Sequence, residues 1–190
     1  MRDCTQFYID GQWVDPVEEN TVAVENPATE ETIGHISFGA CADVDKAVAA
    51  ARRAFESFSQ TSKEERLTLL RAIQAEIETR KEELATAVSD EMGAPLSLAN
   101  GPHVGLLAGH CQKAIEVLEG FAFERLDCPT LHVWEPVGVV GMITPWNWPL
   151  NQIACKVFPA LATGNTMVLK PSEIAPFNAY IFAEIMHAAG

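Results

Sequence analysis

Residues Gly138–Glu173, GVVGMITPWNWPLNQIACKVFPALATGNTMVLKPSE, hold most of the information about the fold of this chain. Its first part, residues 139–143, is rich in β-branched side chains and predicts a strand that stops at a Thr-Pro pair. After Pro149, which a first helical turn tolerates, apolar side chains recur at helical spacing until Gly164-Asn165. A second strand is expected over residues 166–169. The order strand, helix, strand predicts a parallel βαβ unit.

Two clusters of polar and aromatic residues follow the two expected strands. Trp146 and Asn147 come after the first strand, and Lys170 and Glu173 come after the second. Because ligands of open α/β sheets bind at the carboxyl ends of parallel strands, both clusters are expected to face one site.

Each cluster allows two interpretations. The Asn147 amide could donate to a developing oxyanion, or it could satisfy the backbone of its own turn. Lys170 and Glu173 could bind the hydroxyls of a diol, or they could form a surface salt bridge worth under about 1 kcal/mol. Spacing alone favours the second interpretation in both cases.

A family resemblance rests on these same residues. The segments PWNWP, PALATGN and KPSE, at this spacing, resemble the amino-terminal half of the aldehyde dehydrogenase superfamily. The early segments FYIDGQWV and ENPATEETIGHI resemble the family's opening, so the resemblance covers nearly all 190 residues. It implies an α/β fold, namely the amino-terminal part of a Rossmann-like cofactor-binding domain. A parallel βαβα unit in an incomplete sheet would be preceded by short strands and amphipathic helices.

The resemblance assigns roles to both clusters, so it favours the functional interpretation of each over the structural one. Asn147 matches the family's oxyanion donor, and Lys156 matches a lysine that serves a proton relay or supports the active site in some members. A carboxylate beside the cofactor would repel a 2′-phosphate, so NAD is favoured over NADP. The residues that hold the adenosine ribose match Lys170, Pro171, Ser172 and Glu173.

A backbone wall that faces the cofactor is also implied. For Ile143 a core position is an equal alternative, because this residue continues the strand. The wall matches Ile143, Thr144, Pro145 and Trp146.

The activity implied for a full-length protein is NAD-dependent oxidation of an aldehyde to a carboxylate through a cysteine thioester. In relatives the catalytic cysteine and the general-base glutamate lie beyond the position of Gly190, so this chain alone is expected to be inactive. The substrate would be an aldehyde, and the full-length protein is expected to form a homodimer or homotetramer. Two alternatives stay open: a truncated, non-catalytic binding or assembly module, and a relative that passes the acyl group to CoA.

Three regions are expected along the chain. Residues 1–123 would form the amino-terminal strands and helices of the cofactor-binding domain. Residues 124–137 would begin a protruding oligomerisation sheet, and residues 138–190 the first βαβα part of the dinucleotide-binding fold. The catalytic domain is expected outside this chain.

Local patterns predict the elements of the first and last regions. Asp10-Gly11 is expected as a hairpin turn, and Asp43 as the N-cap of a first helix. A capping box at Ser62 and Glu65 predicts one long helix that ends at Gly93. Further helices are expected over residues 97–121 and 176–189, and strands over residues 6–14, 21–25 and 32–38.

Composition limits the partners. Acidic residues outnumber basic ones, 26 to 13, giving a net charge of −13 that repels nucleic-acid phosphates and anionic membranes. The amino terminus lacks the apolar core of a secretory signal, which indicates a cytoplasmic protein.

Five cysteines without a Cys-x-x-Cys pair and histidines without metal spacing argue against disulfides and metals. Cys155 is expected to pack inertly on its helix and not to act as a nucleophile.

Overall fold

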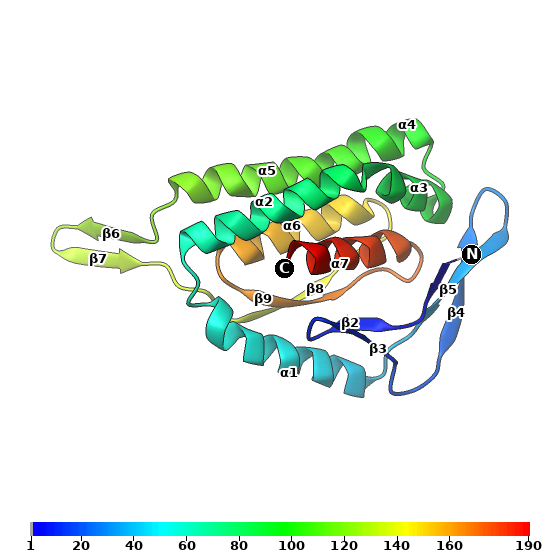
Figure 1. Cartoon of the computed structure of the whole chain (residues 1–190), viewed down its shortest axis with the longest axis horizontal. Coiled ribbons are helices and arrows are strands. Elements are labelled where there is room, and N and C mark those ends of the chain that lie inside the picture. The colour runs from blue at the N-terminus through cyan, green and yellow to red at the C-terminus, as the bar shows by residue number, and fades with distance from the viewer. Residues whose placement is uncertain (1) are drawn as a thin grey trace.

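The computed structural model describes residues 2–190. At its centre two parallel strands, β8 (Val139–Ile143) and β9 (Thr166–Lys170), are joined by helix α6 (Pro149–Ala162). Helix α7 (Phe177–Ala189) follows β9 and completes the predicted βαβα order (Figure 1). The expected α/β fold with an incomplete sheet is confirmed.

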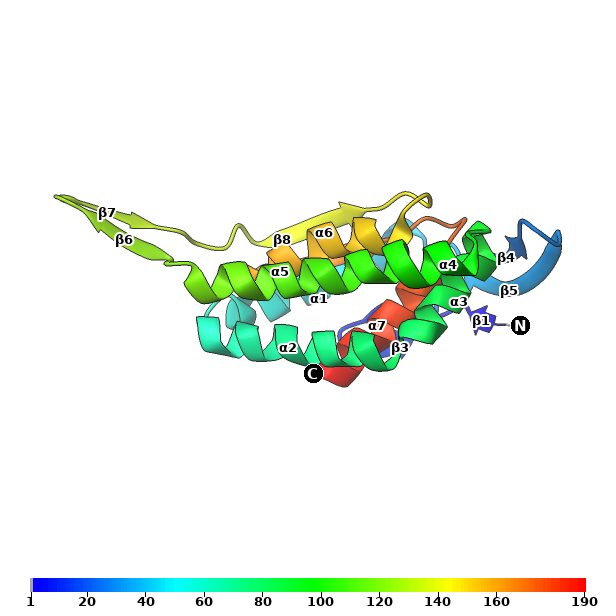
Figure 2. The same cartoon turned by 90° about the horizontal axis from the view of Figure 1, so that it is seen from above.

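Helices cover both faces of this strand pair. α1 (Cys41–Phe58) packs on one face and α6 on the other (Figure 1). The Thr166 hydroxyl at the start of β9 donates to the carbonyl of Ala51 in α1 at 2.8 Å. α5 (Val104–Gly120) packs against α6, and α2 (Lys63–Thr79) against α5, so the helices form a further layer (Figure 2). None of the helices within residues 2–190 is both long and apolar enough to cross a membrane.

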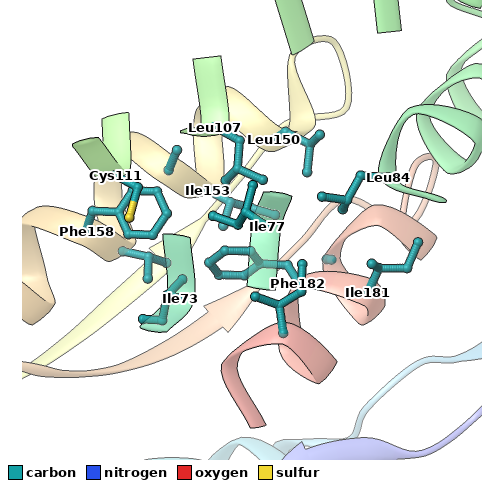
Figure 3. Packing of buried hydrophobic residues seen from close by; sticks show 14 of the residues in the cluster. Ile73, Ile77, Leu84, Leu107, Cys111, Leu150, Ile153, Phe158, Ile181 and Phe182 are labelled. Atoms are coloured by element: carbon teal, nitrogen blue, oxygen red, sulfur yellow. The ribbon is translucent and has the colours of Figure 1, made fainter. Parts of the chain in front are cut away.

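The hydrophobic core lies where α2, α3 (Lys81–Met92), α5, α6 and α7 meet. Their apolar stripes face inward at helical spacing, and fully burying one such aliphatic side chain contributes about 1.5–3 kcal/mol. The expected inner face of α6 is confirmed, since Ile153 and Val157 are buried. Figure 3 shows the converging side chains, among them Ile73, Ile77, Leu84, Leu107, Cys111, Leu150, Ile153, Phe158, Ile181 and Phe182.

Short strands precede the helices. β2 (Phe7–Ile9) and β3 (Gln12–Val14) form the expected hairpin, and Asp10-Gly11 turns between them with positive φ at both residues. The other two expected strands are β4 (Thr21–Asn26) and β5 (Glu31–Ser37), which pair antiparallel. β1 (Arg2–Cys4), which pairs parallel with β5, was not predicted from the sequence, because three residues are too few to show a period.

A second hairpin projects from the body of the molecule. β6 (Glu124–Asp127) and β7 (Thr130–Val133) pair antiparallel, and every residue of both strands is exposed. Cys128 and Pro129 make the turn, where a proline removes no ladder hydrogen bond. Figures 1 and 2 both show the hairpin extending beyond the helices.

The expected N-cap at Asp43 is wrong. α1 begins two residues earlier, at Cys41, so Asp43 lies in the first helical turn. Its carboxylate still caps the helix, because one oxygen accepts from the Ala40 amide at 3.0 Å. The other oxygen accepts from the Val17 amide at 3.0 Å, which ties the loop before β4 to α1.

The expected long helix from Ser62 to Gly93 is also wrong. It breaks at Arg80 into α2 and α3 (Lys81–Met92), although the capping box at its start is present. The Arg80 guanidinium donates locally to Glu83 and, across the fold, to Glu184 of α7, and both contacts accompany the bend. Helical periodicity continues through the bend, which is why the sequence pattern did not show it.

The expected helix over residues 97–121 starts irregularly. A single turn, α4 (Leu96–Leu98), leads into a π-helical turn, η1 (Ala99–His103), before α5 begins. Pro102 lies inside the π turn, and a wider turn accommodates a residue that has no amide hydrogen to donate.

The end of α6 depends on a glycine. Gly164 has φ +76, and a Cβ at this position would lie 2.7 Å from the Arg66 guanidinium. Arg66 is itself held by the Ser59 and Thr61 carbonyls, at 3.2 and 2.8 Å, so it cannot move aside freely. The turn from α6 into β9 therefore requires a residue without a side chain.

We expect Gly164→Ala to lower the free energy of unfolding by about 1–2 kcal/mol from left-handed strain alone, with the clash against Arg66 in addition. Gly109→Ala is the matched control, because Gly109 lies exposed in α5 with nothing within 4 Å of its missing Cβ. That substitution should raise the stability by about 0.5–1 kcal/mol. Urea unfolding of both variants measures the difference, and equal effects would contradict the role of Gly164.

The buried Glu91 carboxylate makes stability depend on pH. Burial raises its pKa from 4.5 to about 7, against the lowering effect of its hydrogen bonds with Asn178 and Phe177. Between these two pH values the folded chain holds a proton that the unfolded chain has lost. The contribution of Glu91 to stability is therefore fully present below pH 4.5 and is lost as the pH rises through 7. Urea unfolding at pH 5 and pH 8 should show this loss in the wild type and not in Glu91→Gln.

Candidate functional site

The two strand ends form the floor of the candidate site. The parallel register pairs Ile143, the last residue of β8, with Lys170, the last residue of β9. The next amide, that of Thr144, donates to the Lys170 carbonyl at 3.2 Å. The loop that carries Asn147 and the loop that carries Glu173 therefore leave the sheet from neighbouring positions.

The Trp146-Asn147-Trp148 turn lies between β8 and α6. Asn147 is exposed, and within residues 2–190 its side-chain amide makes no hydrogen bond, so the amide does not satisfy its own turn. Trp148 is partly buried, and its indole stacks on the His103 ring with centroids 4.3 Å apart and planes 16° apart. Pro149 then opens α6 at its first position, as predicted. The turn thus presents an unused amide donor beside a fixed aromatic ring.

Lys170 and Glu173 contact each other after β9. Lys170 Nζ lies 2.9 Å from Glu173 Oε2, and about half of each side chain is exposed. The pKa of Glu173 is lowered, first by its own backbone amide and then by Lys170, so the carboxylate is ionised at neutral pH. Ser172 is buried, and its hydroxyl accepts from the Ile174 amide at 3.3 Å. Pro171 is partly buried between the two charged residues.

The expected cofactor wall differs in burial along its length. Ile143 is 78% exposed, so the alternative that it lies in the core is wrong. Pro145 and Trp146 are also exposed, whereas Thr144 is 4% exposed and anchors the wall to β9. An exposed isoleucine at the end of a central strand leaves an apolar surface beside the charged pair.

Lys156 is held within its own helix. Its ammonium donates to the carbonyl of Gln152 at 3.1 Å and to the side-chain oxygen of Gln152 at 2.9 Å. Cys155 is exposed, which contradicts the expectation that it packs inertly among apolar residues. The helical period explains the error, because residue 155 falls on the outer face while residues 153, 154 and 157 face inward.

Two buried residues near the site were not singled out as functional from the sequence. His103 in η1 supports Trp148 with its ring, and neither ring nitrogen has a partner within residues 2–190. The Gly101-Pro102 pair before it was the available sign of an irregular turn. The second buried residue is Glu91, near the end of α3. The helix dipole disfavours an acid at a helix C-terminus, so its presence there was a sign of a tertiary contact. Among residues 2–190 no cluster of three or more His, Cys, Asp or Glu side chains suits a metal ion.

Comparison with known proteins identifies the family. Residues 13–190 match the aldehyde dehydrogenase family. The chain is 53% identical, over its whole length, to a 3-succinoylsemialdehyde-pyridine dehydrogenase from a Pseudomonas species, and it spans 40% of that protein. It is also 47% identical to a putative aldehyde dehydrogenase of Staphylococcus aureus strain bovine RF122/ET3-1, again across 40% of the relative.

Solved structures agree with these sequence matches. An aldehyde dehydrogenase from Bartonella henselae superposes with a TM-score of 0.97 at 42% identity, over 100% of this chain and 40% of the other. A mutant of aldehyde dehydrogenase C from Pseudomonas syringae, in complex with NAD+ and octanal, also has a TM-score of 0.97, at 49% identity, over 98% of this chain and 39% of the other. The chain thus spans about two fifths of the proteins that it matches. By sequence and by fold, this chain belongs to the aldehyde dehydrogenase family.

Proposed function

We propose that this chain is the amino-terminal portion of an NAD-dependent aldehyde dehydrogenase that oxidises an aldehyde to a carboxylate through a cysteine thioester. The observation that carries the proposal is the pairing of Ile143 with Lys170, because it sets the Asn147 turn beside the Lys170–Glu173 pair. One loop then faces the reacting carbonyl and the other faces the cofactor. Family membership and the NAD+ complex of the Pseudomonas syringae relative support this reading.

Asn147 is the proposed oxyanion donor. Its amide is exposed and makes no hydrogen bond within residues 2–190, so it is free to donate to a reacting oxygen. Trp148 is fixed by its stack on His103, which limits the motion of the turn. A donor held in place before the reaction stabilises the developing charge without reorganisation at the moment of reaction.

Lys170 and Glu173 are the proposed ribose clamp. A donor and an acceptor 2.9 Å apart and half-exposed fit the two neighbouring hydroxyls of a ribose, so the residues present suit NAD. The ionised Glu173 carboxylate accepts from a hydroxyl and repels a 2′-phosphate. Bound NAD would accept a hydride from the substrate. Pro171 and the buried Ser172 shape the backbone of this clamp.

The remaining sites belong to the same proposal. Through Gln152, Lys156 stabilises helix α6, which follows the Asn147 turn.

The β6–β7 hairpin exposes Leu126, Leu131 and Val133, and we propose that it pairs subunits of a homodimer or homotetramer. The cofactor wall comprises Ile143, Thr144, Pro145 and Trp146.

The nucleophile and the general base are proposed to come from residues outside these 190. The alternative is a non-catalytic binding or assembly module, and the intact mass of the native protein separates the two. A species more than twice as heavy as this chain supports the dehydrogenase, whereas a native product of this length supports the module.

In a full-length protein, Asn147→Ala should lower kcat by about a hundredfold or more, as loss of one oxyanion donor does. The Kd for NAD should stay unchanged, because the amide is needed only where charge develops. Stopped-flow measurement of NADH formation gives kcat, and titration calorimetry gives the Kd. A variant with near-normal kcat would exclude Asn147 as the oxyanion donor.

Lys170→Ala should weaken NAD binding about tenfold, since one charge-assisted hydrogen bond is lost. Glu173→Gln should weaken NAD binding less and improve binding of NADP, because the repulsion of the 2′-phosphate disappears. Titration calorimetry with both dinucleotides tests this. If both variants bind NAD and NADP with unchanged affinity, Lys170 and Glu173 form only a surface salt bridge.

A further inference from the structure

Glu91 connects α3 to the start of α7. It lies in the last turn of α3, and only 1% of the residue is exposed. Its carboxylate accepts from the Phe177 amide, from the Asn178 amide at 3.0 Å and from the Asn178 side chain at 2.7 Å. α7 has no side-chain cap of its own, since Pro176 stands at the N-cap position. Glu91 therefore caps α7 from another helix, 86 residues earlier in the chain.

The same contact reaches the loop that carries the ribose clamp. The Asn178 side-chain nitrogen has two hydrogens, and it donates to Glu91 and also to the Ala175 carbonyl at 2.8 Å. At the other end of this loop the Lys170 carbonyl accepts from the Thr144 amide. The segment from Lys170 to Ala175 is thus held at both ends, and Glu173 lies between the two anchors.

The chemistry of Glu91 indicates that this residue supplies geometry, and that it does so at an energetic cost once it is ionised. A buried carboxylate is expensive even when it is hydrogen-bonded, and burial raises the pKa of Glu91 to about 7. Its position near the C-terminus of α3 is unfavourable to a negative charge as well. An apolar residue would fill the space with no desolvation penalty, but it could not accept the three N–H groups of Phe177 and Asn178.

We infer that Glu91 is a positioning residue for NAD: through Asn178 and Ala175 it fixes the far end of the Lys170–Glu173 loop. The near end is fixed by β8, so both ends must hold for the two charged groups to keep the spacing that a ribose needs. This inference rests on the proposed function of the clamp. It assigns no contact between Glu91 and the cofactor itself.

The test compares Glu91→Gln with Asp90→Asn in a full-length protein. Glutamine keeps one accepting oxygen but places an NH2 group in the cluster of N–H donors. Asp90 is next to Glu91 and is exposed, so its substitution removes a carboxylate from the same turn of α3 without removing a hydrogen bond to α7. We expect the Kd for NAD, from titration calorimetry, to rise about tenfold in Glu91→Gln, as for one lost charge-assisted hydrogen bond, and to stay unchanged in Asp90→Asn. The kcat at saturating NAD should change less than twofold.

A second variant removes the link and leaves the carboxylate in place. Asn178→Ala deletes the side chain that joins Glu91 to Ala175 and should raise the Kd for NAD by a similar factor. Amide hydrogen exchange should quicken at residues 174–178 in both variants while the core helices stay protected. If Glu91→Gln does not fold, Asn178→Ala and its exchange pattern decide the question.

The outcomes separate this inference from the proposed function. If Lys170→Ala weakens NAD binding but folded Glu91→Gln and Asn178→Ala bind NAD like the wild type, the positioning role is overturned and the clamp stands. If Lys170→Ala leaves NAD binding unchanged, the clamp itself fails. A lower Tm in Glu91→Gln with an unchanged Kd for NAD would mean that Glu91 serves only the fold.

Discussion

The parallel pairing of β8 with β9 is the constraint on which the rest of this structure depends. Parallel strands cannot be joined by a tight turn, so the chain must cross over through a helix, and α6 is that helix. The crossover places both carboxyl ends at one edge, with Ile143 opposite Lys170. Two loops that are more than twenty residues apart in the chain therefore start as neighbours, and the candidate site exists because they do.

Buried polar contacts set the positions of the helix ends around this pair. Asn165, just beyond α6, accepts from the Val137 and Gly138 amides at 2.7 and 3.0 Å and so aligns the entry to β8 with the entry to β9. Asp43 caps α1 and holds a loop, and Glu91 caps α7 from α3. These three side chains share one property: each is buried and accepts hydrogen bonds from backbone amides at the start of a helix or in a loop. Apolar packing holds the helices together, while such contacts decide where the loops between them lie.

Periodicity and turn chemistry were enough for much of the fold. The β8–α6–β9 order, the hairpin at Asp10-Gly11 and the capping box at Ser62 depend on neighbouring residues, so local patterns predict them. The bend at Arg80, the π turn before α5 and the first strand β1 were missed. The bend at Arg80 and strand β1 involve partners far along the chain, Glu184 for Arg80 and β5 for β1, which no local window contains. The π turn is a local feature, and the Gly101-Pro102 pair was its only sign in the sequence.

For the site, the order of the residues shows which side chains follow each strand, and the motifs PWNWP and KPSE identify the family. The packing of the folded chain decided that Ile143 faces outward, that Cys155 is exposed, and that His103 supports Trp148. It also decided that Glu91 reaches α7, through three hydrogen bonds that span more than eighty residues. The physical reason is that strand and helix propensities act between neighbours, whereas the burial of a side chain and the partner of a buried charge depend on how separate elements pack.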